Sequence, residues 1–304
     1  MLHSRTRLAP VLAAAAALSG CASARFYLHF APYYLAGGGP KAECAEGPGF
    51  RYCSHRAPRG VAEDPDAVLY FLHYAGGSER SWSKIPIARV YYAEFKRRGL
   101  PAPRVVTVSY GPYWMLFDKP GPKSPGRFGP FVEDAMPFIE GRLGRPRRRY
   151  VWGMSQGGLN GAELVLKRPD LWSGAVLSCP AIFTISVFAA PARIDEFIGR
   201  TGAVRSTAVW GMSLISDRVE GPEEWGREDP LARARTSSGL PPVYIDCTAA
   251  DEFGFFEGAR RLAGSLRERG QHVTFVEETG KHCQLDARAA AGFLADLAAS
   301  GPAP

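Results

Sequence analysis

The sequence has 304 residues, of which 46% are hydrophobic and 22% charged. This composition is that of a globular protein, and it excludes the disordered, collagen-like and fibrous classes. The formal net charge is +7, but Arg5 and Arg7 lie in an N-terminal segment that holds no acidic residue. The remaining positive excess is mild and no nucleic-acid-binding motif accompanies it, so nucleic acid is not expected as a partner.

The N-terminus is predicted to be an export signal. Two arginines precede the apolar run Leu8–Leu18, which is too short to span a bilayer as a helix. Residues 18–21 then read Leu-Ser-Gly-Cys, which resembles the lipobox of bacterial lipoproteins. The resemblance implies a signal peptide over residues 1–21, a lipid on Cys21, and an exported protein anchored to a bacterial membrane and facing the periplasm or the cell surface. The alternative is a plain secretory signal that is cleaved just beyond this cysteine.

The cysteine pattern agrees with export. Cys44 and Cys53 flank a Gly-Pro-Gly turn and are predicted to form a disulfide in an oxidising compartment. Cys179, Cys247 and Cys283 remain, so at least one of them is expected to be free or unexpectedly paired. A second bridge between Cys247 and Cys283 is the open alternative. The spacing of cysteines and histidines matches no zinc pattern, and no metal site is expected.

The predicted elements alternate between strands and helices along most of the chain. Residues 22–50 are interpreted as a tether and lead-in, followed by an early edge strand over Phe50–Ala57. Ala67–His73 is an apolar run, which is typical of a central parallel strand covered on both faces. The next predicted elements, in chain order, are a helix over Ile85–Arg98, a strand over Val105–Tyr110 and a helix over Phe131–Leu143.

A strand, a tight turn and a helix then surround one serine. Tyr150–Trp152 is a short apolar run, residues 153–157 read Gly-Met-Ser-Gln-Gly, and Leu159–Lys167 has helical spacing. This order predicts a nucleophile elbow, in which two glycines permit a sharp turn and Ser155 projects its hydroxyl from the top of a sheet. The backbone N–H of Gln156 would then face a developing oxyanion. The alternative is a glycine-rich turn that carries an ordinary serine.

The rest of the chain resumes the alternation after one interruption. Ala175–Ser178 is a further strand, whereas residues 181–240 contain no clean βα unit and are predicted to form a lid-like insertion over the carboxyl edge of the sheet. The pattern as a whole predicts an α/β fold with a doubly wound, mainly parallel sheet, whose site lies beyond the strand carboxyl ends. The last predicted elements are strands over Val243–Cys247 and Val273–Val276 and helices over Glu257–Arg269 and Ala287–Ala299.

A serine nucleophile needs a base, and the base needs an orienting acid. The chain has six histidines, and His282 is the one in a loop between the last predicted strand and the last helix. Asp251 follows the preceding strand, with Glu252 as its closest rival. Alternatives remain at this stage: Asp251 could serve only as a helix N-cap, and His282 could be a surface residue.

These motifs resemble the exported α/β-hydrolases of the esterase D, feruloyl esterase and polyhydroxybutyrate depolymerase group. Residues 73–77 read His-Tyr-Ala-Gly-Gly, close to that group's His-Gly-x-Gly-Gly, and Ser155, Asp251 and His282 follow its triad order. The resemblance covers residues 50–300, with a hydrolase domain over 51–300. It implies that Ala75 N–H is the second oxyanion donor. Tyr74 departs from the pattern by replacing a glycine.

The sequence therefore predicts a serine hydrolase that cleaves carboxylic esters through an acyl-enzyme, without a cofactor, on a small-molecule or polymeric substrate. Tyr74, Tyr113 and Trp114 are predicted to contact the substrate. Alternatives on the same triad are a peptidase, a thioesterase or an acyltransferase, and a different class is an inactive, surface-anchored binding lipoprotein. Further aromatics are expected in a lid, namely Phe183, Phe188 and Trp210.

Overall fold

The structure is a computed structural model that describes residues 40–300. The predicted signal segment, the lipid site at Cys21 and most of the predicted tether lie outside these residues. No helix within them is long and apolar enough to cross a membrane.

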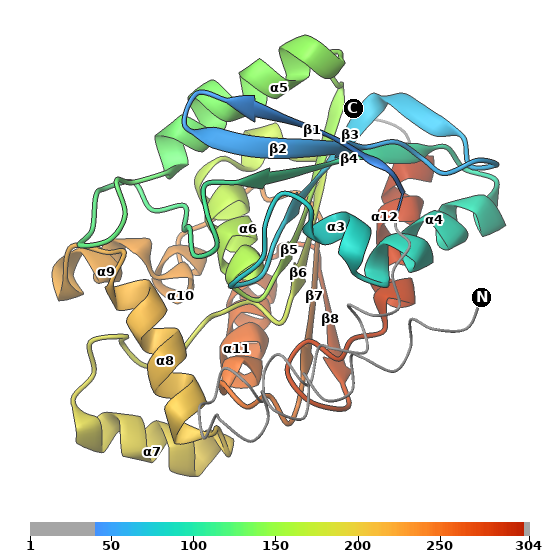
Figure 1. Cartoon of the computed structure of the whole chain (residues 1–304). Coiled ribbons are helices and arrows are strands. Elements are labelled where there is room, and N and C mark those ends of the chain that lie inside the picture. Colours follow the sequence, from blue (N-terminus) through green and yellow to red (C-terminus); the bar gives the residue numbers. More distant parts are fainter. Residues whose placement is uncertain (1–39, 301–304) are drawn as a thin grey trace, which may run out of the picture.

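One eight-stranded sheet organises the described chain, in the strand order β1-β2-β4-β3-β5-β6-β7-β8 (Figure 1). The six strands from β4 to β8 in this order pair in parallel, and β1 and β2 are antiparallel to their neighbours. The fold class that the sequence predicts is confirmed. The strands are β1 (Ala42–Gly47), β2 (Phe50–His55), β3 (Glu63–Leu72), β4 (Ala102–Ser109), β5 (Arg148–Met154), β6 (Gly174–Ser178), β7 (Val243–Thr248) and β8 (Val273–Glu278).

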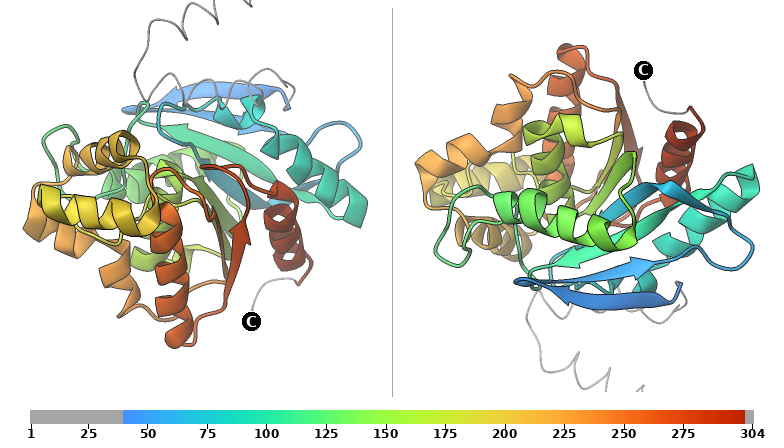
Figure 2. Two further views of the ribbon diagram at one scale, coloured as in Figure 1. Left: turned by 90° about the horizontal axis from the view of Figure 1, so that it is seen from below. Right: turned by 90° about the horizontal axis from the view of Figure 1, so that it is seen from above.

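Helices cover both faces of this sheet, as expected for a doubly wound fold. Figure 2 shows α4 (Ile87–Arg98) and α12 (Ala287–Ala299) on one face, and α6 (Gln156–Lys167) and α11 (Phe255–Glu268) on the other. β6 is fully buried between the two layers, which explains its apolar sequence. Further short elements are α3 (Ser81–Lys84), a π-helical turn η1 (Pro130–Ala135) that continues into α5 (Met136–Leu143), and a 3-10 turn η2 (Pro169–Leu171).

The sheet begins earlier than the sequence predicts. Residues 42–47, interpreted as lead-in, form β1, which pairs with β2 in an antiparallel hairpin. β2 is therefore an inner strand between β1 and β4, and the prediction of an edge strand there is wrong. The polar, mostly exposed residues of β1 gave no apolar alternation to recognise.

A disulfide closes this hairpin. Cys44 and Cys53 lie directly opposite each other and are bonded, as the sequence predicts. Replacing both with alanine is expected to lower the free energy of unfolding by about 2–3 kcal/mol, because the bond restricts a short loop of the unfolded chain. Chemical denaturation would measure this loss. A reducing agent should destabilise the wild type by the same amount and leave the double variant unchanged; an equal effect on both would contradict the prediction.

Four helices and no strand lie between β6 and β7, in the segment that the sequence predicts to be a lid-like insertion. They are grouped beside the sheet in Figure 1. A buried ion pair ties them to the elbow helix: Lys167 Nζ at the end of α6 lies 2.6 Å from the carboxylate of Glu228 in α9. The insertion is therefore a packed part of the domain. Its helices are α7 (Pro191–Thr201), α8 (Arg205–Ser216), α9 (Pro222–Glu228) and α10 (Pro230–Ala234).

Candidate active site

Ser155 sits on a strained turn between β5 and α6. Its φ of 57° and ψ of −117° are unusual for a residue with a side chain. The turn is possible because two glycines leave room for it. A Cβ on Gly153 would lie 1.9 Å from the carbonyl oxygen of Gly157, and one on Gly157 would lie 2.0 Å from that of Leu72. Strand, turn and helix thus have the geometry of a nucleophile elbow.

The histidine selected by elimination reaches this serine. His282 lies in the loop between β8 and α12, and its Nε2 is 2.9 Å from Ser155 Oγ. Its Nδ1 is 2.5 Å from Asp251 Oδ2. A carboxylate only accepts hydrogen bonds, so Nδ1 carries the proton, and in the neutral ring the Nε2 lone pair faces the serine hydroxyl. This tautomer is the one that a general base requires.

The second carboxylate oxygen of Asp251 also accepts hydrogen bonds, which fix the side chain in place. Oδ1 accepts hydrogen bonds from the amides of Phe253 at 2.9 Å and Phe255 at 3.3 Å. The residue therefore supports the start of α11 and contacts His282 at once, so the two predicted roles coexist. The rival carboxylate of Glu252 accepts the backbone N–H of His282 at 3.0 Å instead.

The surroundings of His282 act on its pKa in opposite directions. Burial disfavours the imidazolium and would lower the pKa, but the carboxylate of Asp251 and then the sulfur of Cys179 outweigh burial and raise the pKa to about 10. The site thus stabilises the protonated ring that forms when His282 takes a proton from serine. The rings of Phe253 and Phe255, with centroids 4.6 Å and 5.5 Å from that of the imidazole, pack beside it.

Two amides are available for an oxyanion. Ala75, Ser155 and Gln156 line one cavity, which brings the predicted donors to the predicted nucleophile. The amide of Gln156 opens α6, where a helix offers no internal acceptor. The amide of Ala75 has no backbone acceptor within residues 40–300. Both N–H groups can therefore bind an oxyanion without losing another bond.

His73 fixes the loop that carries Ala75. Its Nδ1 donates to the carbonyl of Tyr74 at 2.9 Å, and its Nε2 accepts the indole N–H of Trp114 at 2.8 Å and contacts Ser109 Oγ at 3.0 Å. Burial lowers the pKa of His73 to about 4, so the ring stays neutral and keeps both bonds. The oxyanion loop is thereby held by a buried network.

Two residues that the sequence predicts to contact the substrate, Tyr74 and Trp114, are instead partners of His73 in this network. Trp114 is 4% exposed and bound to His73, and neither it nor Tyr74 lines the cavity at Ser155. Tyr113 does not line it either, but it packs edge-on against Trp210, which does. Of the other aromatics expected in the lid, Phe183 is buried in the core. Tyr113 and Trp114 therefore contact residues of the site without lining its cavity.

The cavity itself is small and mostly apolar, with a volume of about 20 Å³. One wall comes from α8 of the insertion and another from the residues that follow Asp251. Sequence reasoning missed most of these residues, because apolar side chains on an irregular insertion give no pattern that distinguishes lining from core. Besides Ala75, Ser155 and Gln156, the cavity is lined by Met115, Ala181, Trp210, Gly211, Leu214, Ile215, Phe253 and Phe255.

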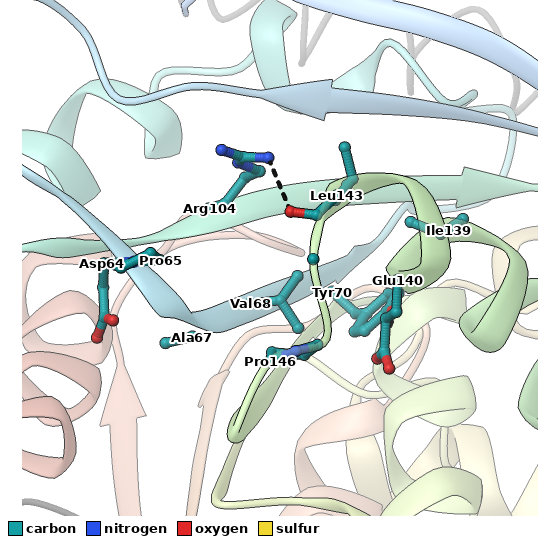
Figure 3. A pocket seen from close by; sticks show the side chains of 11 residues that line it. Asp64, Pro65, Ala67, Val68, Tyr70, Arg104, Ile139, Glu140, Leu143 and Pro146 are labelled. Carbon is teal, nitrogen blue, oxygen red and sulfur yellow. Dashed lines mark hydrogen bonds between the residues drawn. The ribbon is translucent and has the colours of Figure 1, made fainter.

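A larger cavity, of about 60 Å³, lies elsewhere and has a different character (Figure 3). It is found near the start of β3 and the end of α5, at the opposite end of the sheet from Ser155. Its charged side chains already have partners: Arg104 pairs with Glu63, and Glu140 accepts two hydrogen bonds from Arg149 at 2.7 Å. No serine, cysteine or histidine lines it. We therefore assign the site to the smaller cavity.

The remaining cysteines surround the histidine. Cys179, Cys247 and Cys283 are all free and buried, so the alternative of a Cys247–Cys283 disulfide is wrong. Cys283 Sγ lies 3.3 Å from His282 Nε2, and Cys247 Sγ lies 3.9 Å from Asp251 Oδ2. These thiols come from three separate segments, and no spacing in the sequence indicates that the fold brings them together.

No protein-family model and no curated protein sequence matches this chain. Among solved structures, brefeldin A esterase, described as a bacterial homologue of human hormone-sensitive lipase, is 19% identical with a TM-score of 0.62, over 97% of this chain and 88% of that one. An arylesterase is 15% identical with a TM-score of 0.63, over 95% and 97% of the two chains. A ferulic acid esterase is 12% identical with a TM-score of 0.59, over 84% and 97%. These similarities show that the chain has the α/β-hydrolase fold.

Proposed function

We propose that the protein is a serine hydrolase that cleaves carboxylic esters through an acyl-enzyme. The observation that carries the proposal is the continuous hydrogen-bonded chain from Ser155 Oγ through His282 to Asp251, with contacts of 2.9 Å and 2.5 Å. Ser155 attacks the ester carbonyl while His282 Nε2 takes its proton, and the alcohol leaves with that proton. Water then adds to the acyl-enzyme by the same route and releases the acid.

The amides of Gln156 and Ala75 would bind the oxyanion of both tetrahedral intermediates. Their position on the wall of the Ser155 cavity supports this assignment. Fixed N–H donors lower the barrier because they are already oriented when charge develops on the oxygen. The hydrogen bond from Gly76 N–H to Pro112, at 2.8 Å, helps to hold the Ala75 loop in this orientation.

The cavity favours esters with a short acyl group. Its volume of about 20 Å³ accommodates little more than a water molecule, and its walls are apolar.

The structural neighbours carry the names of esterases, which agrees with ester cleavage. The finer assignment, to exported enzymes similar to esterase D, feruloyl esterases and polyhydroxybutyrate depolymerases, rests on the sequence motifs. The substrate is then a small-molecule or polymeric ester.

Hydrolysis of a p-nitrophenyl ester series of increasing acyl length by the full chain, with Ser155→Ala beside it, tests the function. Activity that is highest for the shortest esters and absent from the variant supports the proposal. If both proteins are inactive on esters but the wild type cleaves a thioester or a peptide, the substrate class is wrong and the triad is right. Inactivity on every class, together with no labelling by a fluorophosphonate, would favour a binding lipoprotein.

Shortening Leu214 is expected to shift the preference toward longer acyl chains. Leu214 is a half-buried residue of α8 that lines the cavity, so Leu214→Ala adds space beside Ser155. We expect kcat/KM for longer esters to rise relative to acetyl esters by about 10-fold, the effect of one or two methylenes. Val209→Ala on the same helix, at a position that is 39% exposed and outside the cavity, is the matched control. An equal shift in both variants would contradict the assignment of the acyl pocket.

We also propose that the protein is an exported lipoprotein, tethered to a membrane through a lipid on Cys21. The sequence that precedes this cysteine supports the assignment, and the Cys44–Cys53 disulfide is typical of exported proteins. Incorporation of a labelled fatty acid by bacterial cells that express the protein would test it. Loss of the label in Cys21→Ala is expected, and an unlabelled wild type would contradict the anchor.

A further inference from the structure

Two of the buried thiols lie beside the imidazole ring of His282. Cys179 directly follows β6, and Cys283 directly follows His282. The sulfur atoms of these cysteines and a ring nitrogen of the histidine all lie within 4.8 Å of one another. The 3.3 Å contact of Cys283 Sγ is with Nε2. Three donors thus converge on one point beside the nucleophile.

The backbone holds both thiols in this position. Cys179 and Cys283 have φ values of 42° and 58°, and Ser155 is the third residue other than glycine with a positive φ within residues 40–300. The amide of Cys179 donates to the carbonyl of Asp246 at 2.7 Å, which ties its segment to β7. Such conformations persist only where the surrounding structure enforces them, and they concentrate at functional sites.

The donor set matches the preference of zinc. Two sulfurs and one imidazole nitrogen are ligands of the kind that Zn²⁺ selects. Bond lengths of about 2.3 Å to sulfur and about 2.0 Å to nitrogen place tetrahedral ligands roughly 3.5–3.8 Å apart. The convergence described above requires only small side-chain adjustments to reach this arrangement.

Charge balance also favours a divalent ion. Cys179 and Cys283 are 0% and 5% exposed, and a buried ion needs compensation by charges of opposite sign. When Zn²⁺ binds, each thiol loses one proton to solvent, and the two thiolates balance the charge of the metal. We propose that Cys179, His282 and Cys283 form a binding site for Zn²⁺ that lies against the catalytic centre.

Zn²⁺ bound at this site would prevent His282 from activating Ser155. His282 Nε2 has one lone pair, and a metal bound to it excludes the proton of Ser155 from the same nitrogen. This consequence rests on the proposed function, whereas metal binding does not. Cys247 lies near Asp251, where Cys179, Cys247 and Asp251 form a second group of possible donors within 4.8 Å of one another. It is not a ligand in the proposed arrangement.

Titration of the full chain with Co²⁺ as a spectroscopic probe tests the site directly. Sulfur ligation is expected to produce thiolate-to-cobalt charge-transfer absorption and the intense visible bands of tetrahedral Co²⁺, at one ion per chain, and Zn²⁺ should displace them. Cys179→Ala and Cys283→Ala should each weaken binding by about 100-fold or more. Cys247→Ala, the matched control, should retain it. Circular dichroism would establish that each variant is folded.

Three results would overturn the proposal. One is binding that persists in both Cys179→Ala and Cys283→Ala, and another is binding lost in Cys247→Ala alone, which would move the site to the Asp251 side. The third is a disulfide among these cysteines, detected by alkylation of the metal-free protein and peptide mass spectrometry, which would make the cluster a site of oxidation.

Ser155→Ala separates this proposal from the proposed function. The variant is expected to bind Co²⁺ as the wild type does, although it cannot hydrolyse esters. Inhibition of wild-type hydrolysis by Zn²⁺ and its reversal by a chelator would then connect the two. Metal binding without any esterase activity would contradict the proposed function and leave the metal site intact.

Discussion

Ser155→Ala is expected to lower kcat for ester hydrolysis by roughly 10⁴- to 10⁶-fold. The hydroxyl is the atom that forms the acyl bond, and without it His282 and Asp251 have no nucleophile to activate. The free energy of unfolding should change by less than about 1 kcal/mol, because alanine keeps the Cβ and only a small polar group is removed. Initial rates with a short-chain aryl ester, together with thermal denaturation, would measure both quantities.

A second serine provides the matched control. Ser178 is also buried beside the elbow, but its hydroxyl accepts the indole N–H of Trp152 at 3.0 Å. Ser178→Ala should therefore lose some stability and keep its activity within about 10-fold. A fluorophosphonate should label the wild type and Ser178→Ala at Ser155, and it should not label Ser155→Ala. Labelling of another serine, or activity in Ser155→Ala, would contradict the assignment of the nucleophile.

The sheet was predictable because its central strands and its turns carry local signals. β3 and β5 each contain an apolar run bounded by polar or glycine-rich residues, and the sequence around Ser155 specifies a strand, a tight turn and a helix within one short stretch. The parallel order then follows from the alternation of elements. β1 was missed because its residues are polar and mostly exposed, and its pairing depends on a partner strand rather than on its own pattern.

The order of the triad was predictable, and its surroundings were not. Ser155, Asp251 and His282 each follow a strand, and parallel strands bring such positions to one edge. Trp114 also follows a strand, but its indole N–H donates a hydrogen bond to His73. No local sequence pattern indicates this contact. Convergence of Cys179 and Cys283 is likewise a property of strand order. These contacts depend on how distant segments pack in three dimensions, and no spacing of residues along the sequence indicates them.

Asp251→Asn is expected to lower kcat by about 10⁴-fold while leaving the fold intact. The amide of asparagine can donate a proton toward Nδ1 of His282, which favours the tautomer that carries its proton on Nε2. That tautomer cannot accept the proton of Ser155. The hydrogen bonds that Oδ1 accepts from Phe253 and Phe255 can be made by the oxygen of asparagine, so the start of α11 should survive. Steady-state kinetics on a short-chain ester would measure the loss.

The pH profile gives this prediction a second readout. His282 must be neutral to act as a base, so kcat/KM should rise with pH through the pKa of His282, with a midpoint above the ordinary value of 6.5 because Asp251 raises that pKa. Removing the negative charge in Asp251→Asn takes this contribution away, and the residual activity should rise at lower pH than in the wild type.

Glu252→Gln is the matched control, since its side-chain oxygen can still accept the hydrogen bond from the backbone amide of His282. It should keep both the rate and the midpoint near those of the wild type. If Glu252→Gln shifted the profile and Asp251→Asn did not, the orienting acid would be Glu252, and the 2.5 Å contact between Asp251 and His282 would have no role in catalysis.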